Sequence, residues 1–231
     1  DATADASEAS AWITLVENGS NLGFVRGNNV AIAHADPAAD ILLLNNDTEI
    51  HQDGWLEELQ AAAYRQPEIG IAGCRQLLPN GQLLHAGTYM PRSVWWGQQI
   101  GSLEKDVNQY GLDREVEGVV GAVMYIKRAV IDKIGLLDEA FFSYFEDTDY
   151  CLRAAAAGFR TICAGGVTIV HHQNVSSTVN QVNFSKLFLT SQKTFRQKWE
   201  KQLMSKAETA VFWHSQVGTP SGYAVSAREM I

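Results

Sequence analysis

The chain is poor in cysteine and proline, and it contains no long hydrophobic run. Three cysteines among 231 residues are too few, and odd in number, to form a disulfide framework. We therefore expect reduced thiols and a cytoplasmic protein. No segment approaches the roughly 20 consecutive apolar residues that a membrane-spanning helix requires.

Basic residues are also scarce. The chain has 18 Lys and Arg against 26 Asp and Glu, which gives a formal net charge of −8. Because nucleic-acid binding depends on a surplus of basic side chains, we expect no nucleic-acid partner. A hydrophobic fraction of 46% argues against a disordered chain, and the length suits one α/β domain with room for a small appendage.

The most informative stretch is a short aliphatic run that ends in polar residues. Ile, Leu, Leu and Leu at 41–44 precede Asn45, Asn46, Asp47, Thr48 and Glu49. Such a run is typical of a buried strand in a parallel sheet, and ligand crevices form at the carboxyl edge of such sheets. Asp47 is then either a ligand for a hard cation or the cap of a turn, and this stretch alone does not decide.

Strand and helix patterns alternate along the first third of the chain. We expect strands at 12–17, 41–44 and 69–73, a helix from Asn28 or Asn29 to His34, and a second helix capped by Asp53 and ended by Pro67. This order predicts an α/β fold with a mostly parallel sheet flanked by helices.

The middle of the chain is less regular. We expect a turn at 78–82, an irregular excursion at 85–116, a strand at 119–126, helices at 128–134 and 148–157, and short strands at 159–163 and 167–170. Gly158 is well placed to end the second of these helices. Excursions as long as 85–116 are usually functional or disordered.

Residues 184–206 have a clear helical period. Phe184, Leu187, Phe188, Phe195, Trp199 and Leu203 form one stripe, whereas six Lys and Arg against Glu200 give the segment a net charge of +5. A basic amphipathic helix can lie on the inner face of an anionic membrane, as a peripheral contact. The alternative, which we favour, is that the stripe packs on the domain and the basic residues are solvated.

A second acidic cluster follows the aromatic run at 141–145. Glu146, Asp147 and Asp149 are close enough in sequence for like charge and apolar surroundings to raise a carboxyl pKa, which suits a general base. The same residues could instead cap a helix, with Arg153 as an ion-pair partner. We assign Glu146 and Asp147 to catalysis, and Asp149 and Arg153 to structure.

Two adjacent histidines end the last predicted strand. Adjacent strand residues point to opposite faces, so at most one of His171 and His172 can face a crevice. One of them, with Asp47, phosphate oxygens and water, would make a sensible Mn²⁺ or Mg²⁺ site. The spacing alone is weak evidence, since a lone histidine is more often structural.

Seven segments in the same order resemble family 2 glycosyltransferases of the GT-A (Rossmann-like) fold, and in particular the rhamnosyltransferase-like group of bacterial polysaccharide synthesis. These segments lie at 21–29, 44–48, 80–87, 121–128, 135–142, 145–153 and 170–172. The resemblance covers about residues 11–172, and the acidic segment at 145–153 is its most specific part.

The resemblance implies a reaction and a set of roles. Such enzymes transfer a sugar, with inversion, from a nucleotide-diphosphate donor (UDP or dTDP) to a hydroxyl of a glycan or lipid-linked acceptor. Asp147 would be the base, with Glu146 beside it, and Asp47 and His171 would hold Mn²⁺ or Mg²⁺. The donor would contact Asn21, Gly23, Phe24, Asn28, Asn29 and Asn45, and the acceptor Trp95, Trp96, Gly121 and Ala122.

The chain departs from the family pattern at both ends. The family's first strand and helix have no counterpart here, and 210–228 resembles the opening of a GT-B-like domain. We therefore expect an amino-terminally truncated GT-A domain at 1–182, a basic helix at 183–206 and a tail at 207–231 that begins a further domain. The alternative function is a non-catalytic fragment or binding module of a larger glycosyltransferase.

Overall fold

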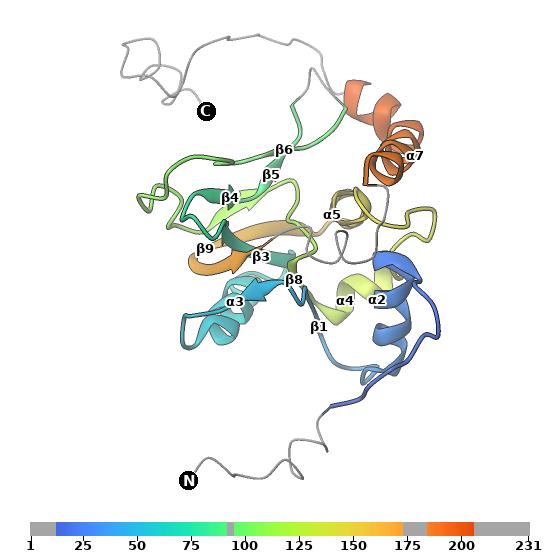
Figure 1. Cartoon of the computed structure of the whole chain (residues 1–231), viewed down its shortest axis with the longest axis horizontal. Helices are drawn as coiled ribbons and strands as arrows, with labels where there is room; N and C mark the ends of the chain where they lie inside the picture. The colour runs from blue at the N-terminus through green and yellow to red at the C-terminus, as the bar shows by residue number, and fades with distance from the viewer. Residues whose placement is uncertain (1–12, 92–94, 173–183, 206–231) are drawn as a thin grey trace.

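The computed structural model describes residues 13–91, 95–172 and 184–205, in which helices flank a central sheet (Figure 1). The helices are α2 (Gly23–His34), α3 (Trp55–Tyr64), α4 (Arg128–Ile134), α5 (Glu146–Ala156) and α7 (Phe184–Ser205). The main sheet contains β1 (Ile41–Leu44), β2 (Thr48–Glu49), β3 (Ile69–Leu77), β4 (Leu83–His85), β7 (Arg114–Val116), β8 (Val123–Ile126) and β9 (Arg160–His171). A separate pair is formed by β5 (Thr88–Tyr89) and β6 (Gln98–Gln99).

The α/β fold class is confirmed, but the expected parallel majority is wrong. The strand order is β1-β8-β3-β9-β2, with β4 beside β3 and β7 beside β9. Of these pairs only β3–β9 is parallel: β8 lies between β1 and β3 and is antiparallel to both, and β2, β4 and β7 each pair antiparallel with their neighbour. A buried apolar run such as 123–126 reads the same in either direction, so its pattern could not reveal this reversal.

The sheet separates two apolar layers. On one face, α3 packs Leu59, Ala62 and Ala63 against strand residues such as Tyr125 and Ile169. The other face is covered by residues of α2, α4, α5 and α7, which form one larger cluster with strand residues such as Met124. This three-layer arrangement leaves the carboxyl ends of β1 and β9 free to carry polar side chains.

The helices form close to the predicted positions, with different starts. Helix α4 spans the predicted residues, whereas α2 begins at Gly23 rather than at Asn28 or Asn29. Asp53 does not cap α3, because Gly54 occupies the N-cap position with a φ of +70°. Gly158 follows α5 with a φ of +94°, as expected of a glycine that ends a helix.

Two strand predictions are wrong. Described residues 13–17 form no strand, and Ile13 and Leu15 are 73% and 81% exposed, so neither packs on the sheet. The strands expected at 159–163 and 167–170 are one continuous strand, β9, which runs through Gly165 and Gly166 without a break. A Cβ on Gly165 would lie 2.3 Å from the Leu112 carbonyl oxygen, so this glycine permits close approach of a loop.

Helix α7 packs on the domain through the carboxyl-terminal half of its apolar stripe. Phe195, Trp199 and Leu203 are all buried and belong to the larger core cluster. The packing that we favoured is therefore present, while contact with a membrane stays a prediction. Within the described ranges, none of the helices combines the length and hydropathy needed to cross a bilayer. The tail at 207–231 lies outside the described residues.

Candidate active site

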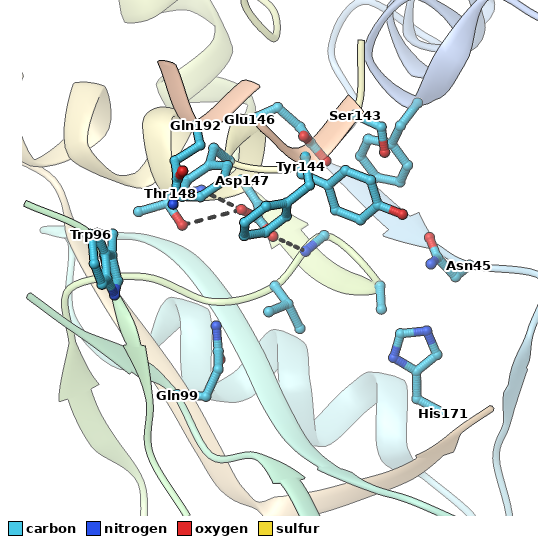
Figure 2. A pocket seen from close by; sticks show the side chains of 17 residues that line it. Asn45, Trp96, Gln99, Ser143, Tyr144, Glu146, Asp147, Thr148, His171 and Gln192 are labelled. Atoms are coloured by element: carbon cyan, nitrogen blue, oxygen red, sulfur yellow. Dashed lines mark hydrogen bonds between the residues drawn. The ribbon is translucent and has the colours of Figure 1, made fainter. Parts of the chain in front are cut away.

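A cavity of about 680 Å³ opens between the sheet edge, the start of α5 and the helix α7 (Figure 2). Eight of the residues selected from the sequence line it. They are Phe24, Asn45, Trp96, Gly121, Ala122, Glu146, Asp147 and His171. The cavity thus gathers residues from segments more than 140 positions apart in the chain.

Asp147 reaches this cavity from the first turn of α5. Its Oδ2 accepts a hydrogen bond from the Gly121 backbone N–H at 3.1 Å, and its Oδ1 accepts from the backbone N–H and hydroxyl of Thr148 (Figure 2). Burial raises the pKa of Asp147 above its usual value, although these hydrogen bonds oppose the rise. A carboxylate that is desolvated, oriented and open to a cavity is suited to accept a proton.

Two features of the backbone bring Asp147 to this position. Tyr144 and Phe145 both adopt positive φ, 71° and 70°, which is uncommon for residues with side chains and turns the chain sharply into α5. Beside Asp147, a Cβ on Gly121 would lie 2.9 Å from the Phe24 ring. Gly121 therefore lets the backbone pass beneath Phe24 and present its N–H to Asp147.

Glu146 is more deeply buried than Asp147, with a residue exposure of 5%. Its Oε2 has no hydrogen-bond partner among the described residues. Burial, followed by the like charge of Asp147, raises the pKa of Glu146 well above its usual value. The protonated, neutral form of Glu146 is therefore the one that this environment favours.

Asp149 and Arg153 have the structural roles that we expected. The Arg153 Nε donates to Oδ2 of the fully buried Asp149 at 2.9 Å, and the Trp199 Nε1–H donates to its Oδ1 at 2.8 Å. Lys198 completes this set at 2.7 Å from Oδ1. The group joins α5 to α7 and so supports one wall of the cavity.

Asp47 and His171 meet at the other side of the site, where β2 pairs with β9. The His172 backbone N–H donates to the Asp47 carbonyl, which places the Asp47 side chain beside His171. The Nε2 of His171 lies 3.3 Å from Oδ1 of Asp47. His172 instead contacts Glu49 at 2.7 Å, so the two histidines point to different surroundings, as strand alternation predicts.

The Asp47–His171 pair has the chemistry of a cation site. The Nδ1 of His171 is 3.1 Å from Oε1 of buried Gln76, which can only accept, so the ring hydrogen lies on Nδ1. Burial lowers the pKa of His171, which keeps the ring neutral and leaves a lone pair on Nε2 facing Asp47. Oδ1 of Asp47 is buried and accepts no hydrogen bond from described residues, so it and Nε2 of His171 are two ligand atoms of the types that divalent cations accept, although the described residues hold no group of three or more His, Cys, Asp or Glu that could bind a metal ion.

A family described as "Glycosyltransferase like family 2" has a model that matches residues 1–198. The chain belongs to this glycosyltransferase family.

Several curated proteins of glycan synthesis are similar to this family 2 chain. It is 30% identical over 147 residues to the O-antigen biosynthesis protein RfbC of Myxococcus xanthus, covering 62% of this chain and 12% of that protein. It is 26% identical over 180 residues to the low-salt glycan biosynthesis hexosyltransferase Agl10 of Haloferax volcanii, covering 74% and 57%. It is 24% identical over 187 residues to an N-acetylglucosaminyl-diphospho-decaprenol L-rhamnosyltransferase of Mycobacterium tuberculosis, covering 70% and 59%.

The chain thus spans between 12% and 59% of the length of these three relatives. Among solved structures, it is similar to GalNAc-T7, crystallised with UDP, GalNAc and Mn²⁺, at a TM-score of 0.54 and 12% identity. That match covers 72% of this chain and 35% of that one. It confirms the GT-A fold expected of a family 2 glycosyltransferase.

Six of the residues selected from the family 2 motifs do not line the cavity, and Asp47, which contacts the lining residue His171, is one of them. Asn21 accepts a hydrogen bond from the Gly23 N–H at 2.9 Å, and Asn28 donates to the Phe24 carbonyl at 2.8 Å. Both ends of the Asn29 amide bond to the Leu137 backbone, so this buried side chain ties α2 to the loop after α4. The structure therefore gives these three asparagines contacts that shape α2 and its surroundings.

Gly23 and Trp95 also lie beside the lining rather than in it. A Cβ on Gly23 would lie 2.6 Å from the Phe142 carbonyl oxygen, so glycine lets α2 start against the aromatic segment. The Trp95 ring packs edge-on against Trp96, at 5.0 Å between centroids, and lies beneath the Arg196 guanidinium. Trp95 therefore supports Trp96, which does line the cavity.

Sequence reasoning missed about half of the lining. The additional residues are Gly97, Gln99, Val120, Ser143, Tyr144, Phe145, Thr148, Phe188 and Gln192. The residues at 143–145 and 148 flank the acidic pair Glu146 and Asp147, so their nearness to it in sequence could have marked them as site residues. Gln99 on β6 and Gln192 on α7 had no such signal, because only the tertiary fold brings these elements to the site.

Proposed function

We propose that this chain transfers a sugar, with inversion at the anomeric carbon, from a nucleotide-diphosphate sugar to a hydroxyl of a glycan or lipid-linked acceptor in polysaccharide synthesis. The observation that carries the proposal is that Asp147 and the His171 of the Asp47–His171 pair line the same cavity. Family membership and the names of the relatives support sugar transfer.

In this proposal Asp147 is the general base. The acceptor oxygen forms a bond to the anomeric carbon as the bond from that carbon to the diphosphate oxygen breaks. The acceptor proton passes to Asp147, whose carboxylate is already oriented by Gly121 and Thr148. The raised pKa of Asp147 strengthens it as a base relative to an exposed aspartate.

The leaving diphosphate needs positive charge beside it. No Lys or Arg is found among the described residues that line the cavity. Asp47 and His171 would hold Mn²⁺ or Mg²⁺, which would supply Lewis-acid stabilisation of the diphosphate. We further propose that Asn45, next to this pair, contacts the donor, which would carry UDP or dTDP.

The test uses the Asp147→Asn variant. We expect transfer to fall by about 10²- to 10⁴-fold, because the amide cannot accept the acceptor proton. Binding of UDP or dTDP in the presence of Mn²⁺, measured by calorimetry, should be retained. A panel of UDP- and dTDP-sugars with an N-acetylglucosaminyl diphospholipid acceptor, the acceptor type in the mycobacterial relative's name, supplies the transfer assay.

Asp132→Asn is the matched control, since Asp132 is exposed on α4 and lies outside the cavity lining. Transfer by Asp147→Asn at the wild-type rate would refute the assignment of the base. If wild-type chain binds neither nucleotide with Mn²⁺, the result favours a non-catalytic fragment or binding module instead.

A further inference from the structure

Gln99 has an unusual position for a residue that neither the sequence motifs nor the reaction uses. It is one of the two residues of β6 and pairs in register with Thr88 of β5. Adjacent strand residues alternate in direction, and Gln99 lines the cavity whereas Gln98 does not. The Gln99 side chain points into the cavity from the side on which Trp96 lies (Figure 2).

The oxygen of the Gln99 amide is already used within the protein. Oε1 lies in hydrogen-bond contact with Nδ1 of His85 and 3.4 Å from the Thr88 hydroxyl, which donates to it. Among the described residues, none accepts a hydrogen bond from the Gln99 Nε2 in return. The end of the amide that remains for a ligand is therefore the N–H donor.

The buried His85 ring fixes this orientation of the Gln99 amide. It is 1% exposed, and burial lowers its pKa to about 4, so the ring is neutral. Since the atom opposite Nδ1 is the Gln99 oxygen, the neutral His85 ring donates through Nδ1, and this contact holds the Gln99 amide in place. His85 also faces Gln76 across the β3–β4 pair, and Gln76 contacts His171. His85 and Gln76 thus support the two sides of the cavity, through Gln99 and His171 respectively.

The neighbours of Gln99 indicate the kind of ligand. Trp96 and Gln99 lie together on one side of the cavity, whereas Asn45 and His171 lie together on the other, with Asp147 above both (Figure 2). An aromatic face next to a fixed amide donor suits a sugar ring and its hydroxyl oxygens. The described lining holds no Lys or Arg near this side, which disfavours an anionic group there.

We propose that Gln99 binds the acceptor sugar, donating a hydrogen bond from Nε2 to a hydroxyl oxygen other than the one that attacks, and that His85 is the positioning residue for Gln99. The inference rests on the proposed function and names the acceptor as a neutral sugar residue held between Trp96 and Gln99. The attacking hydroxyl of that sugar would then face Asp147.

The test compares Gln99→Ala with Gln98→Ala, two changes of one residue type at adjacent positions. Loss of one hydrogen bond between neutral groups should raise KM for the N-acetylglucosaminyl diphospholipid acceptor by about threefold to tenfold. KM for the sugar donor and Mn²⁺-dependent binding of UDP or dTDP should stay at the wild-type value. Gln98→Ala should change neither KM.

Two further variants test the positioning role. His85→Leu removes the donor to Gln99 and should raise acceptor KM as Gln99→Ala does, with donor KM unchanged. His85→Asn places an amide N–H near the former Nδ1, so acceptor KM should recover toward the wild-type value. A loss of stability without this split between the two KM values would indicate a purely structural His85.

The outcomes separate the two proposals. If Asp147→Asn abolishes transfer but Gln99→Ala leaves acceptor KM unchanged, or raises donor KM instead, the acceptor site proposed here is wrong and the proposed function stands. If the wild-type chain shows no transfer and no nucleotide binding, the proposed function fails and the acceptor site fails with it.

Discussion

At the scale of single residues, the most unusual group is the carboxyl of Glu146. It is buried, its Oε2 lacks a hydrogen-bond partner among the described residues, and its pKa is raised well above 4.5. A carboxyl in this setting is stable as the neutral acid and costly as the anion. Its position beside Asp147 was readable from the sequence, but its burial depends on the aromatic turn at 141–145.

We expect Glu146→Gln to stabilise the fold near neutral pH. Because the folded-state pKa of Glu146 is raised, its contribution to stability is complete below the unfolded pKa of about 4.5 and is lost as pH rises through the folded pKa. The glutamine has no charge to desolvate, so the variant should lack the loss of stability with rising pH that ionisation of Glu146 causes. Thermal unfolding from pH 4 to pH 8 measures the difference in Tm.

The difference in Tm between variant and wild type should therefore widen in favour of the variant as pH rises. Glu139→Gln is a suitable control, since Glu139 is exposed on the surface, where it pairs with Arg26. A constant offset across this pH range would show that Glu146 does not titrate differently in the folded and unfolded chain.

At the scale of elements, helices with a clear period were predicted well, whereas the direction of a strand was not. Helix α4 forms over the predicted residues, and α7 has the predicted apolar stripe. The direction of β8 was missed because a short apolar run does not encode orientation. The start of α3 was missed because Gly54, with positive φ, takes the N-cap position next to the better capping residue Asp53.

Helix α7 contributes to stability through residues that also support the cavity. Phe195 is fully buried and packs against Phe145, at 5.3 Å between ring centroids, just before the acidic pair Glu146 and Asp147. We expect Phe195→Ala to lower the free energy of unfolding by about 3–5 kcal/mol, because it leaves a cavity in the core. Urea denaturation measures this change.

Leu189→Ala on the same helix is the control, since Leu189 is 60% exposed. Its effect should stay within about 0.5 kcal/mol. Equal effects of the two substitutions would contradict the packing of α7 on the domain.

At the scale of the whole molecule, the fold brings together three regions that the sequence keeps apart. The end of β1, the end of β9 and the start of α5 meet at one cavity, and α7 closes part of it. The acidic segments and one histidine could be selected from sequence because their residue types carry chemistry. Gln99, Gln192 and Phe188 could not, because amides and single aromatic residues carry no comparable signal outside their tertiary setting.

The family 2 membership gives the molecule its chemical context, while the arrangement of the cavity gives each residue its proposed role. Asp47 and His171 offer an oxygen and a nitrogen 3.3 Å apart, and Asp147 offers a carboxylate oriented by the Gly121 N–H. The proposed reaction requires the Asp47–His171 pair and Asp147 to act on one substrate.

Anomalous diffraction from crystals grown with Mn²⁺ and UDP tests this dependence most directly. We predict one strong manganese peak between the Asp47 carboxylate and His171 Nε2, with the diphosphate bound in the cavity that Asp147 lines. A manganese peak on other residues, or a diphosphate bound on a surface remote from Asp147, would show that the Asp47–His171 pair and Asp147 do not form one site.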